Sequence, residues 1–483
     1  MTVDWPIKTL GDICEKITDG AHSSPKSVDI GHPMASVKDL TYFGVDLSAA
    51  RLISKSDYEN LTRQGCRPEV GDVLIAKDGN SALDTVCTVD TPLNAVLLSS
   101  VAILRPDKKQ LDSYFLKYYF CSRQVIDYLK SNFISGAAIP RVILKDFRKA
   151  EIKLPPLEVQ KIITKNLRAL DKKIELNNQT NQTLEQIVQA IFKNWFVDFE
   201  PTRAKIIAKE QGADPATQEL AAQAIICGAI TLEQLAELEE SLSASLSAAI
   251  KQKLSQLSST PISAEQLIAT AALFPNALVE SELGEVPKGW GLTTLNSLLE
   301  FNPKRTLKKG TLAPYLDMKN IPTEGHLANE VNLREMTSGT KFINGDTLLA
   351  RITPCLENGK TAYVDFLEEG QVAWGSTEYI VMRPKQGKPL SLGYIIARLD
   401  SFRSKAIQTM TGTSGRQRAN AKALSEQQWV DYPEEILKSF DSVAGAYLAK
   451  AKQNGDEIKC LAELRDALLP KLLSGELTIE AAE

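Results

Sequence analysis

The chain has 483 residues, more than one hydrophobic core usually serves, so two to four domains are expected. Its 43% hydrophobic and 24% charged residues are typical of an ordinary soluble protein, and no apolar run is long enough to span a bilayer. The net charge of −4 excludes a strongly basic nucleic-acid binder.

Charge is unevenly distributed along the chain. Residues 1–157 carry 20 Lys and Arg against 19 Asp and Glu, and residues 285–435 carry 19 against 17. The segment 201–284 carries 5 Lys and Arg against 10 Asp and Glu, so its net negative charge exceeds that of the whole chain. Two slightly positive parts permit DNA binding, provided that local clusters of cations or a partner supply the phosphate contacts.

Residues 1–156 are predicted to form an α+β domain. Short β-type runs at Val73–Ala76 and Leu97–Leu104 alternate with turns such as Asp78-Gly79-Asn80, and a helical patch covers Tyr114–Leu129. The first residues lack a basic, apolar signal peptide, and the seven scattered cysteines form no CxxC pair. Free thiols and a cytoplasmic location are expected.

A long helix is predicted over residues 157–200. Pro155-Pro156 precedes it and Glu158 lies in its first turn, where both residue types favour a helix start. Seam residues then recur in steps of four and three, as in a coiled coil about 57 Å long. They are Ile163, Leu167, Leu170, Ile174, Asn177, Asn181, Leu184, Val188, Ile191 and Trp195.

Asn177 and Asn181 interrupt this seam. A polar seam position penalises slipped pairing and so fixes the register of two helices. Alternatively, the two asparagines mark a wider, solvated stretch. We favour register control, because an asparagine recurs at the equivalent position of a second long helix, Asn454.

The segment 201–284 is rich in Ala, Ser, Leu, Gln and Glu and has no counterpart later in the chain. Two or three Ala-rich helices forming an acidic connector are expected here. A docking surface for another subunit and a packing spacer are equally consistent with this composition.

The remaining sequence repeats the first half. Trp5-Pro6 matches Trp290-Gly291, and Gly71–Lys77 matches Gly345–Arg351. A two-copy repeat of this length predicts a second α+β domain over residues 285–435 and a second long helix over 436–475, followed by a tail, 476–483. The second seam is Phe440, Ala444, Tyr447, Ala451, Asn454, Ile458, Leu461, Arg465, Leu468 and Leu472, in which Arg465 alone departs from the apolar rule. We call the repeated parts copy 1 (1–156) and copy 2 (285–435).

No catalytic site is predicted. Gly359-Lys360-Thr361 ends like a phosphate-binding loop, but Pro354 stands where that loop needs its first glycine. Asn302-Pro303-Lys304 lacks the second proline and the aromatic residue of an amino-methyltransferase motif. The three histidines have no zinc-ligand spacing, so no metal is expected.

Because no catalytic or metal site is predicted, recognition of a binding partner is the function that remains. Matching loops in both copies are predicted to bind DNA. A Lys side chain is suited to reading guanine and an Asn side chain to reading adenine. Because the loop sequence differs between the copies, each copy is expected to recognise a different DNA sequence. Each loop taken alone is more often an ordinary surface loop. The predicted residues of copy 1 are Thr18, Gly20, His22, Lys26, Lys77, Asn80, Gly136 and Arg141. Those of copy 2 are Lys304, Arg305, Arg351, Lys360, Thr413, Ser414, Arg416 and Arg418.

Several motifs together resemble the specificity subunits of Type I restriction–modification systems, and this resemblance covers essentially the whole chain. They are the two units that begin at Trp5 and Trp290, Thr18–Lys26, Leu154–Gln160, Asn194–Pro201, Leu273–Asn276 and Leu283–Trp290. The boundary Pro155-Pro156 is reduced to Tyr432-Pro433 in copy 2, so that junction is expected to bend differently.

The resemblance implies two target-recognition domains separated by a long antiparallel two-helix coiled coil, in a pseudo-twofold arrangement. Each domain would read one half of an asymmetric bipartite site in double-stranded DNA, and the helices would set the gap. The implied partners are two modification subunits, which bind S-adenosylmethionine and methylate adenine, with possible addition of restriction subunits that act as nuclease and translocase. This chain itself would bind no cofactor. The rival hypotheses are a self-contained methyltransferase or nuclease and a coiled-coil assembly factor without a DNA role.

Overall fold

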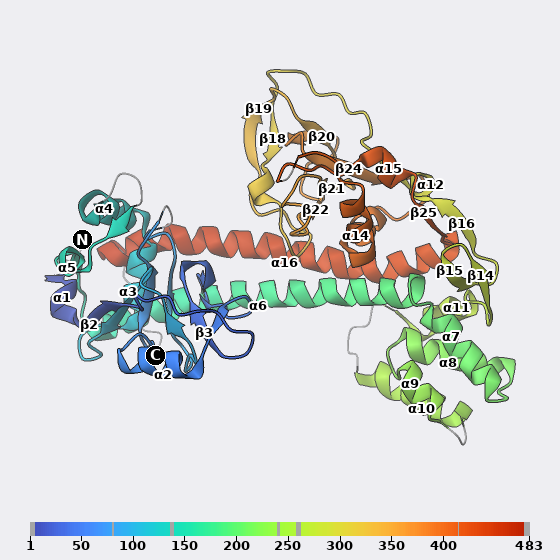
Figure 1. Cartoon of the computed structure of the whole chain (residues 1–483), viewed down its shortest axis with the longest axis horizontal. Helices are drawn as coiled ribbons and strands as arrows, with labels where there is room; N and C mark the ends of the chain where they lie inside the picture. Colours follow the sequence, from blue (N-terminus) through green and yellow to red (C-terminus); the bar gives the residue numbers. More distant parts are fainter. Residues whose placement is uncertain are drawn as a thin grey trace. The chain divides into compact units, whose positions relative to one another are not determined.

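The structure is a computed structural model that describes residues 5–79, 82–135, 140–238, 242–256, 262–413 and 415–477. Its contacts divide the chain into unit 1 (residues 1–176 and 457–483) and unit 2 (residues 177–456). Both long helices, α6 and α16 in Figure 1, are shared between the units, so the unit boundary lies inside them. The six domain segments expected from the sequence stay a prediction.

Unit 1 is built around a four-stranded antiparallel sheet with strand order β2-β10-β7-β8. Successive side chains of β7 point to opposite faces and enter two different cores, Val73 and Ile75 on one side and Leu74 and Ala76 on the other. Burial on both faces explains why this strand is apolar throughout. The strands are β2 Cys14–Asp19, β7 Val73–Ala76, β8 Val86–Thr88 and β10 Val101–Pro106.

Smaller sheets complete unit 1. A three-stranded sheet has the order β6-β3-β9, in which β3 and β9 are parallel, and β1 pairs with β13 beside the long helices. The predicted strand Leu97–Leu104 is divided between β9 and β10, because the chain turns at Ser99 and Ser100. The strands are β1 Ile7–Thr9, β3 His32–Ala35, β4 Leu40–Thr41, β5 Gly44–Val45, β6 Arg51–Ile53, β9 Val96–Leu97, β11 Ile134–Ser135, β12 Arg141–Val142 and β13 Glu151–Lys153.

The predicted helical patch of copy 1 is two helices rather than one. Asp112 begins the first by accepting hydrogen bonds from the backbone N–H groups of Tyr114 and Phe115, and the chain bends at Ser122 between them. The helices of copy 1 are α1 Leu10–Ile13, α2 Lys55–Arg63, α3 Ser113–Cys121, α4 Arg123–Phe133 and α5 Leu144–Phe147, with a 3₁₀ turn at Val37–Asp39.

Unit 2 contains the same framework, which confirms the predicted duplication and the α+β class. Its four-stranded sheet has the order β17-β24-β21-β22, and β18 and β23 are parallel as β3 and β9 are. The strands are β16 Gly291–Thr294, β17 Leu299–Phe301, β18 Leu312–Leu316, β19 Asn332–Glu335, β20 Thr340–Phe342, β21 Thr347–Ala350, β22 Thr361–Tyr363, β23 Ala373–Gly375, β24 Tyr379–Pro384 and β25 Gln428–Asp431. The helices of copy 2 are α12 Leu295–Leu298, α13 Leu392–Arg398, α14 Asp400–Gln408 and α15 Ala421–Ser425, with a 3₁₀ turn at Met318–Asn320.

The two long helices are α6 (Leu157–Phe196) and α16 (Glu434–Ser474). Gly475, with φ of 72°, follows α16 in the left-handed conformation expected of a C-terminal glycine cap. Within each unit the helix segments pack antiparallel, and the predicted seam residues of both helices are buried or half-buried. Leu176, an apolar residue outside the predicted seam, is 56% exposed.

Asparagines occupy the seam inside unit 2. The Asn454 amide donates to Asn181 Oδ1 at 2.9 Å, and the Asn181 amide donates to the carbonyl of Ala451 at 3.0 Å. Asn454 is buried, so a slipped pairing would leave its amide among apolar groups. These hydrogen bonds favour register control over a solvated opening of the seam.

The connector within unit 2 has more helices than the two or three predicted. Five helices lie in its described residues: α7 Glu200–Glu210, α8 Pro215–Ile226, α9 Leu232–Ala236, α10 Leu242–Gln256 and α11 Ala264–Ala272. Capping boxes at Thr231 and Ser263, each with Gln three residues later, start α9 and α11. A hairpin of β14 (Leu278–Ser281) and β15 (Gly284–Pro287) then leads into copy 2.

An aromatic cluster joins the connector, the helix ends and the start of copy 2 inside unit 2. The Trp195 ring lies 5.7 Å from that of Phe274 and 6.1 Å from that of Phe440, and Phe274 lies 6.3 Å from Trp290. Trp195, Phe274 and Trp290 belong to separate motifs of the family resemblance, and their packing explains why an aromatic residue stands in each of these motifs. Among the described residues, no helix is long and apolar enough to cross a membrane.

Candidate nucleic-acid interface

The predicted recognition loops of copy 1 lie together at one end of its four-stranded sheet. Asp19 ends β2 and Lys77 follows β7, and β10 pairs with both strands at this end. The backbone N–H of Val142 donates to the carbonyl of Lys77 at 3.0 Å, and Asp78 forms a bridge with Arg141. Three loops far apart in the sequence therefore form one surface.

Ion pairs organise this surface. Lys77, with a side chain only 7% exposed, places its ammonium 2.6 Å from Asp19 Oδ2, while His22 Nε2 lies 3.2 Å from Asp19 Oδ1. Arg141 Nε lies 3.0 Å from Asp78 Oδ1, and its side chain is 62% exposed. All three side chains have acidic partners within the chain, but Lys77 is buried, whereas Arg141 and His22 are exposed to solvent.

The other predicted residues of copy 1 differ in how they are placed. Thr18 is half-buried in β2, and Lys26 is exposed. Gly20 is buried, and an added Cβ would lie 2.2 Å from the carbonyl oxygen of Leu97, so its lack of a side chain serves close backbone packing. Asn80 and Gly136 lie outside the described residues. Contact of these residues with DNA stays a prediction.

Copy 2 places its loops at the matching end of its own sheet. Arg351 follows β21 as Lys77 follows β7, and Ile352 forms a bridge with Arg418 as Asp78 does with Arg141. Glu378 accepts hydrogen bonds from both Nε and Nη2 of Arg418, at 2.9 and 2.7 Å, a bidentate pair. The two copies therefore share a loop frame and an arginine at the bridging position, Arg141 and Arg418, whereas other loop positions, such as Asp78 and Ile352, carry different side chains.

Free and internally bound cations are mixed in copy 2. Lys304, Thr413 and Arg416 are exposed, while Lys360 Nζ donates to the carbonyl of Met318 at 2.8 Å. Arg305 Nη2 lies 3.2 Å from Asp346. Ser414 lies outside the described residues, and contact of these side chains with DNA stays a prediction.

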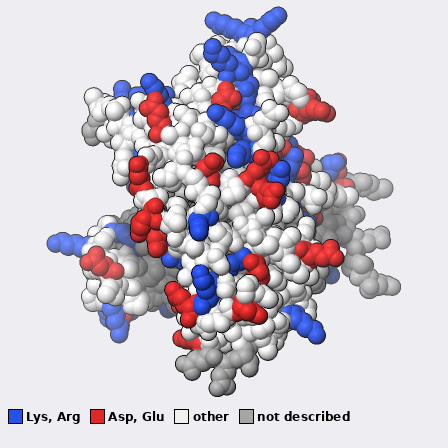
Figure 2. All heavy atoms as spheres, turned by 90° about the vertical axis from the view of Figure 1, so that its right-hand side faces the viewer, with Lys and Arg blue, Asp and Glu red and all other residues white. Residues whose placement is uncertain are grey.

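The segment 302–310 is the most basic stretch of copy 2, with four Lys and Arg and no Asp or Glu. Figure 2 shows Lys and Arg side chains gathered toward the end of unit 2 where Figure 1 places β18 and β19. A local concentration of cations suits a polyanion, although the whole chain carries a net negative charge.

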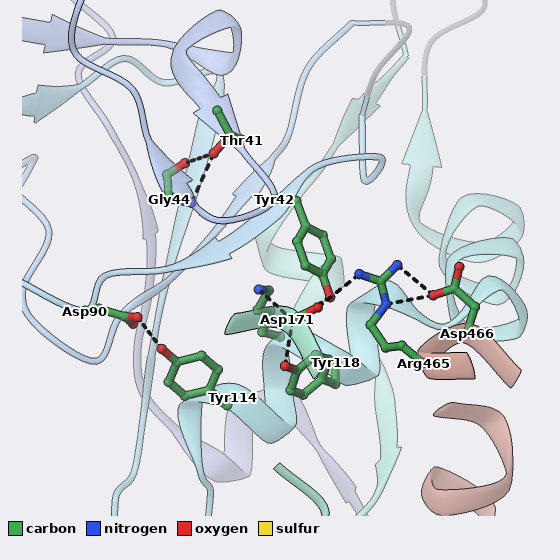
Figure 3. A network of polar contacts seen from close by, with 10 residues as sticks. Thr41, Tyr42, Gly44, Asp90, Tyr114, Tyr118, Asp171, Arg465 and Asp466 are labelled. Atoms are coloured by element: carbon green, nitrogen blue, oxygen red, sulfur yellow. Dashed lines mark hydrogen bonds and ion pairs between the residues drawn. The ribbon is translucent and has the colours of Figure 1, made fainter. Parts of the chain in front are cut away.

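A buried polar network in unit 1 was not foreseen from the sequence (Figure 3). At its centre is Asp171 of α6, which accepts hydrogen bonds from Tyr118 of α3 at 2.7 Å and from Tyr42 at 2.9 Å. Arg465 of α16 donates to the same carboxylate at 3.0 Å, and Lys117 Nζ lies 3.7 Å away. The arginine that interrupts the apolar seam therefore has a partner on the opposite helix.

Burial raises the pKa of both tyrosines in this network, and the Asp171 carboxylate raises each further. Their hydroxyls therefore stay protonated at neutral pH and donate to Asp171. Copy 2 contains a related contact within unit 2, because the hydroxyl of Tyr394 on α13 donates to Glu185 of α6. Each copy thus fixes a tyrosine of its domain helix on a carboxylate of a long helix.

Among the described residues, no three His, Cys, Asp or Glu side chains are arranged to hold a metal ion. All seven cysteines are free thiols. Burial raises the pKa of the Cys14 and Cys87 thiols to about 12, which disfavours their nucleophilic thiolate forms.

Comparisons with known proteins point to one family. A family model described as "Type I restriction modification DNA specificity domain" matches residues 2–186. The Type I restriction enzyme HindI specificity subunit of Haemophilus influenzae is 27% identical over 98% of this chain and 100% of its own length. The EcoAI specificity subunit of Escherichia coli is 28% identical over 43% of this chain and 37% of its own. A crystal structure of a Type I restriction–modification S subunit from M. genitalium, 13% identical, covers 99% of this chain and 97% of its own, with a TM-score of 0.48.

Proposed function

Because the chain belongs to the family of Type I restriction–modification specificity subunits, we propose that it is the non-catalytic DNA-recognition subunit of such a complex. Each copy would read one half of an asymmetric bipartite target in double-stranded DNA. The observation that carries this proposal is the pair of loop clusters on matching sheets, with different side chains in the same frame. Two domains that share a framework but present different side chains suit a DNA target whose two half-sites differ in sequence.

The long helices supply a means of setting the gap between half-sites. A helix of 40 residues is about 60 Å long at 1.5 Å per residue, and half-sites one duplex turn apart are separated by about 34 Å. The Asn181–Asn454 and Asp171–Arg465 contacts support a fixed register of the two helices, each within its own unit. We propose that the helices also dock two modification subunits.

In this proposal the chain binds no cofactor and acts in the cytoplasm. S-adenosylmethionine would be bound by the modification subunits, which methylate adenine in each half-site. Restriction subunits would add nuclease and translocase activity where the system includes them.

The proposal is tested by co-expressing the chain with its modification subunit and mapping adenine methylation of the host genome at base resolution. A two-part motif with a fixed gap is expected. A continuous motif would contradict the two-reader arrangement. A stable complex that methylates nothing would favour an assembly role, and methylation by this chain alone would favour a self-contained enzyme.

Lengthening both helices together should change the gap and spare the half-sites. Seven residues inserted in α6 after Leu176, with seven in α16 before Glu457, keep the four-and-three seam pattern and add about 10 Å. The methylated motif is expected to keep both half-sites with a gap longer by up to about three base pairs. A control inserts seven residues within 257–261, between α10 and α11, and should leave the gap unchanged. An altered base preference in the helix variant would refute the proposed role of the helices.

A further inference from the structure

A polar hollow of about 270 Å³ lies beside the recognition loops of copy 2. Three cations line it, Arg305, Lys341 and Arg351, together with the hydroxyl-bearing residues Thr340 and Thr377. Its lining, taken from the described residues, includes no Asp or Glu. Such a lining is suited to an oxyanion.

Among the described residues, Arg351 has no ion-pair partner. Its Nε is buried, and within the described part of the chain no hydrogen-bond or ion-pair partner contacts its side chain. Arg305 also has a buried, unpartnered Nε, and its Nη2 shares the Asp346 carboxylate with Arg383. Arg305 and Arg383 thus share one carboxylate, and Arg351 has none among the described residues. This leaves an excess of positive charge at the hollow.

Copy 1 provides an internal comparison. Lys77 and Arg351 occupy the same position, one residue after the paired strands β7 and β21. In copy 1 the cation is neutralised by Asp19, which follows Thr18 at the end of β2. The pairing of β17 with β24 ends at Phe301, and Asn302 donates its backbone N–H to the carbonyl of Val381. The next residue, which is Asp19 in copy 1, is Pro303 in copy 2 and carries no carboxylate that could neutralise Arg351.

We propose that this hollow binds a phosphate group of the DNA backbone, with Arg351 as its principal ligand and Arg305 and Lys341 as supporting cations. This inference rests on the proposed DNA-binding function and assigns the three cations to positioning on the backbone rather than to reading bases. In copy 1 the corresponding cation, Lys77, is neutralised by Asp19.

The test compares Arg351→Gln with a control, Arg403→Gln, in the full chain assembled with its modification subunits. Arg403 lies on α14, pairs with Asp400 and does not line the hollow. Loss of one phosphate contact should weaken binding roughly tenfold at low salt, equally for target and unrelated duplexes. The slope of log affinity against log salt should become shallower by about 0.9. Arg351→Lys should restore the slope, because it restores the charge.

Two results would overturn this assignment: a salt slope equal to that of Arg403→Gln, or weakened binding of the target duplex alone. Inorganic phosphate separates the two possible sources of the ligand. If phosphate raises the melting temperature of the wild-type chain but not of Arg351→Gln, while the DNA slope is unchanged, the hollow binds free phosphate and the backbone contact is refuted. If the wild-type assembly binds no DNA, the proposed function itself fails, and this inference fails with it.

Discussion

Replacing Asp171 by asparagine is expected to lower the free energy of unfolding by about 3 kcal/mol or more, because it removes the buried counter-charge of Lys117 and leaves Arg465 with the exposed Asp466 in its place. The side chains of Asp171 and Lys117 are 8% and 4% exposed, and that of Arg465 is 15% exposed. An asparagine keeps nearly the same shape and can still accept a hydrogen bond, so the loss measures mainly the charge. Urea unfolding of the full chain, followed by far-ultraviolet circular dichroism, gives the value.

Asp466 provides the matched control. It also bonds Arg465, at 2.8 Å, but its side chain is 64% exposed, so Asp466→Asn should change stability by no more than about 0.5 kcal/mol. Adding Arg465→Met to the Asp171→Asn chain removes a cation that has lost its buried partner and keeps the exposed Asp466, and should recover part of the loss. Equal effects of Asp171→Asn and Asp466→Asn would show that burial does not strengthen this network.

Exchanging copy 1 for that of a relative with a different target is expected to change one half-site completely and leave the other unchanged. Each loop cluster is assembled within one copy, so the exchanged copy brings its own base-contacting side chains with it. The structure also sets the junction. A cut at residue 150 would separate β1 from its partner β13, Glu151–Lys153, so the exchanged segment should run through residue 156.

Adenine methylation mapped at base resolution reads out this exchange. The reciprocal exchange of residues 285–435 is the control and should alter the other half-site only. A change in both half-sites after either exchange would mean that the two copies do not read independently, and an unchanged motif would mean that copy 1 does not read DNA.

Periodic and repeated features of the structure were predictable from the sequence, because they depend on local pattern. The four-and-three spacing predicted both long helices, and the match of Gly71–Lys77 with Gly345–Arg351 predicted two sheets of one design. The connector was underestimated because its helices are too short for a strong periodic signal. The capping boxes at Thr231 and Ser263 were the available signal for the missed boundaries.

Pairings between distant residues were not predictable in the same way. Arg465 was recognised as an exception in the seam, but its partner Asp171 is 294 residues away, and nothing local joins them. Lys77 was identified as a base-reading candidate because it stands in a turn, whereas its pairing with Asp19 depends on how β2 and β7 flank β10. Surface loops carry no periodicity, so sequence alone could not separate exposed cations such as Arg416 from those bound internally, such as Lys360.

The placement of the aromatic residues has a consequence for spectroscopy. Four of the five tryptophans, Trp195, Trp290, Trp374 and Trp429, belong to unit 2, and Trp5 alone belongs to unit 1. Intrinsic fluorescence therefore reports chiefly on unit 2, and unfolding confined to unit 1 would change the emission little. Replacing the four tryptophans of unit 2 by phenylalanine would leave buried Trp5 as the sole tryptophan, so that a red shift of tryptophan emission on adding urea would report the opening of unit 1 alone.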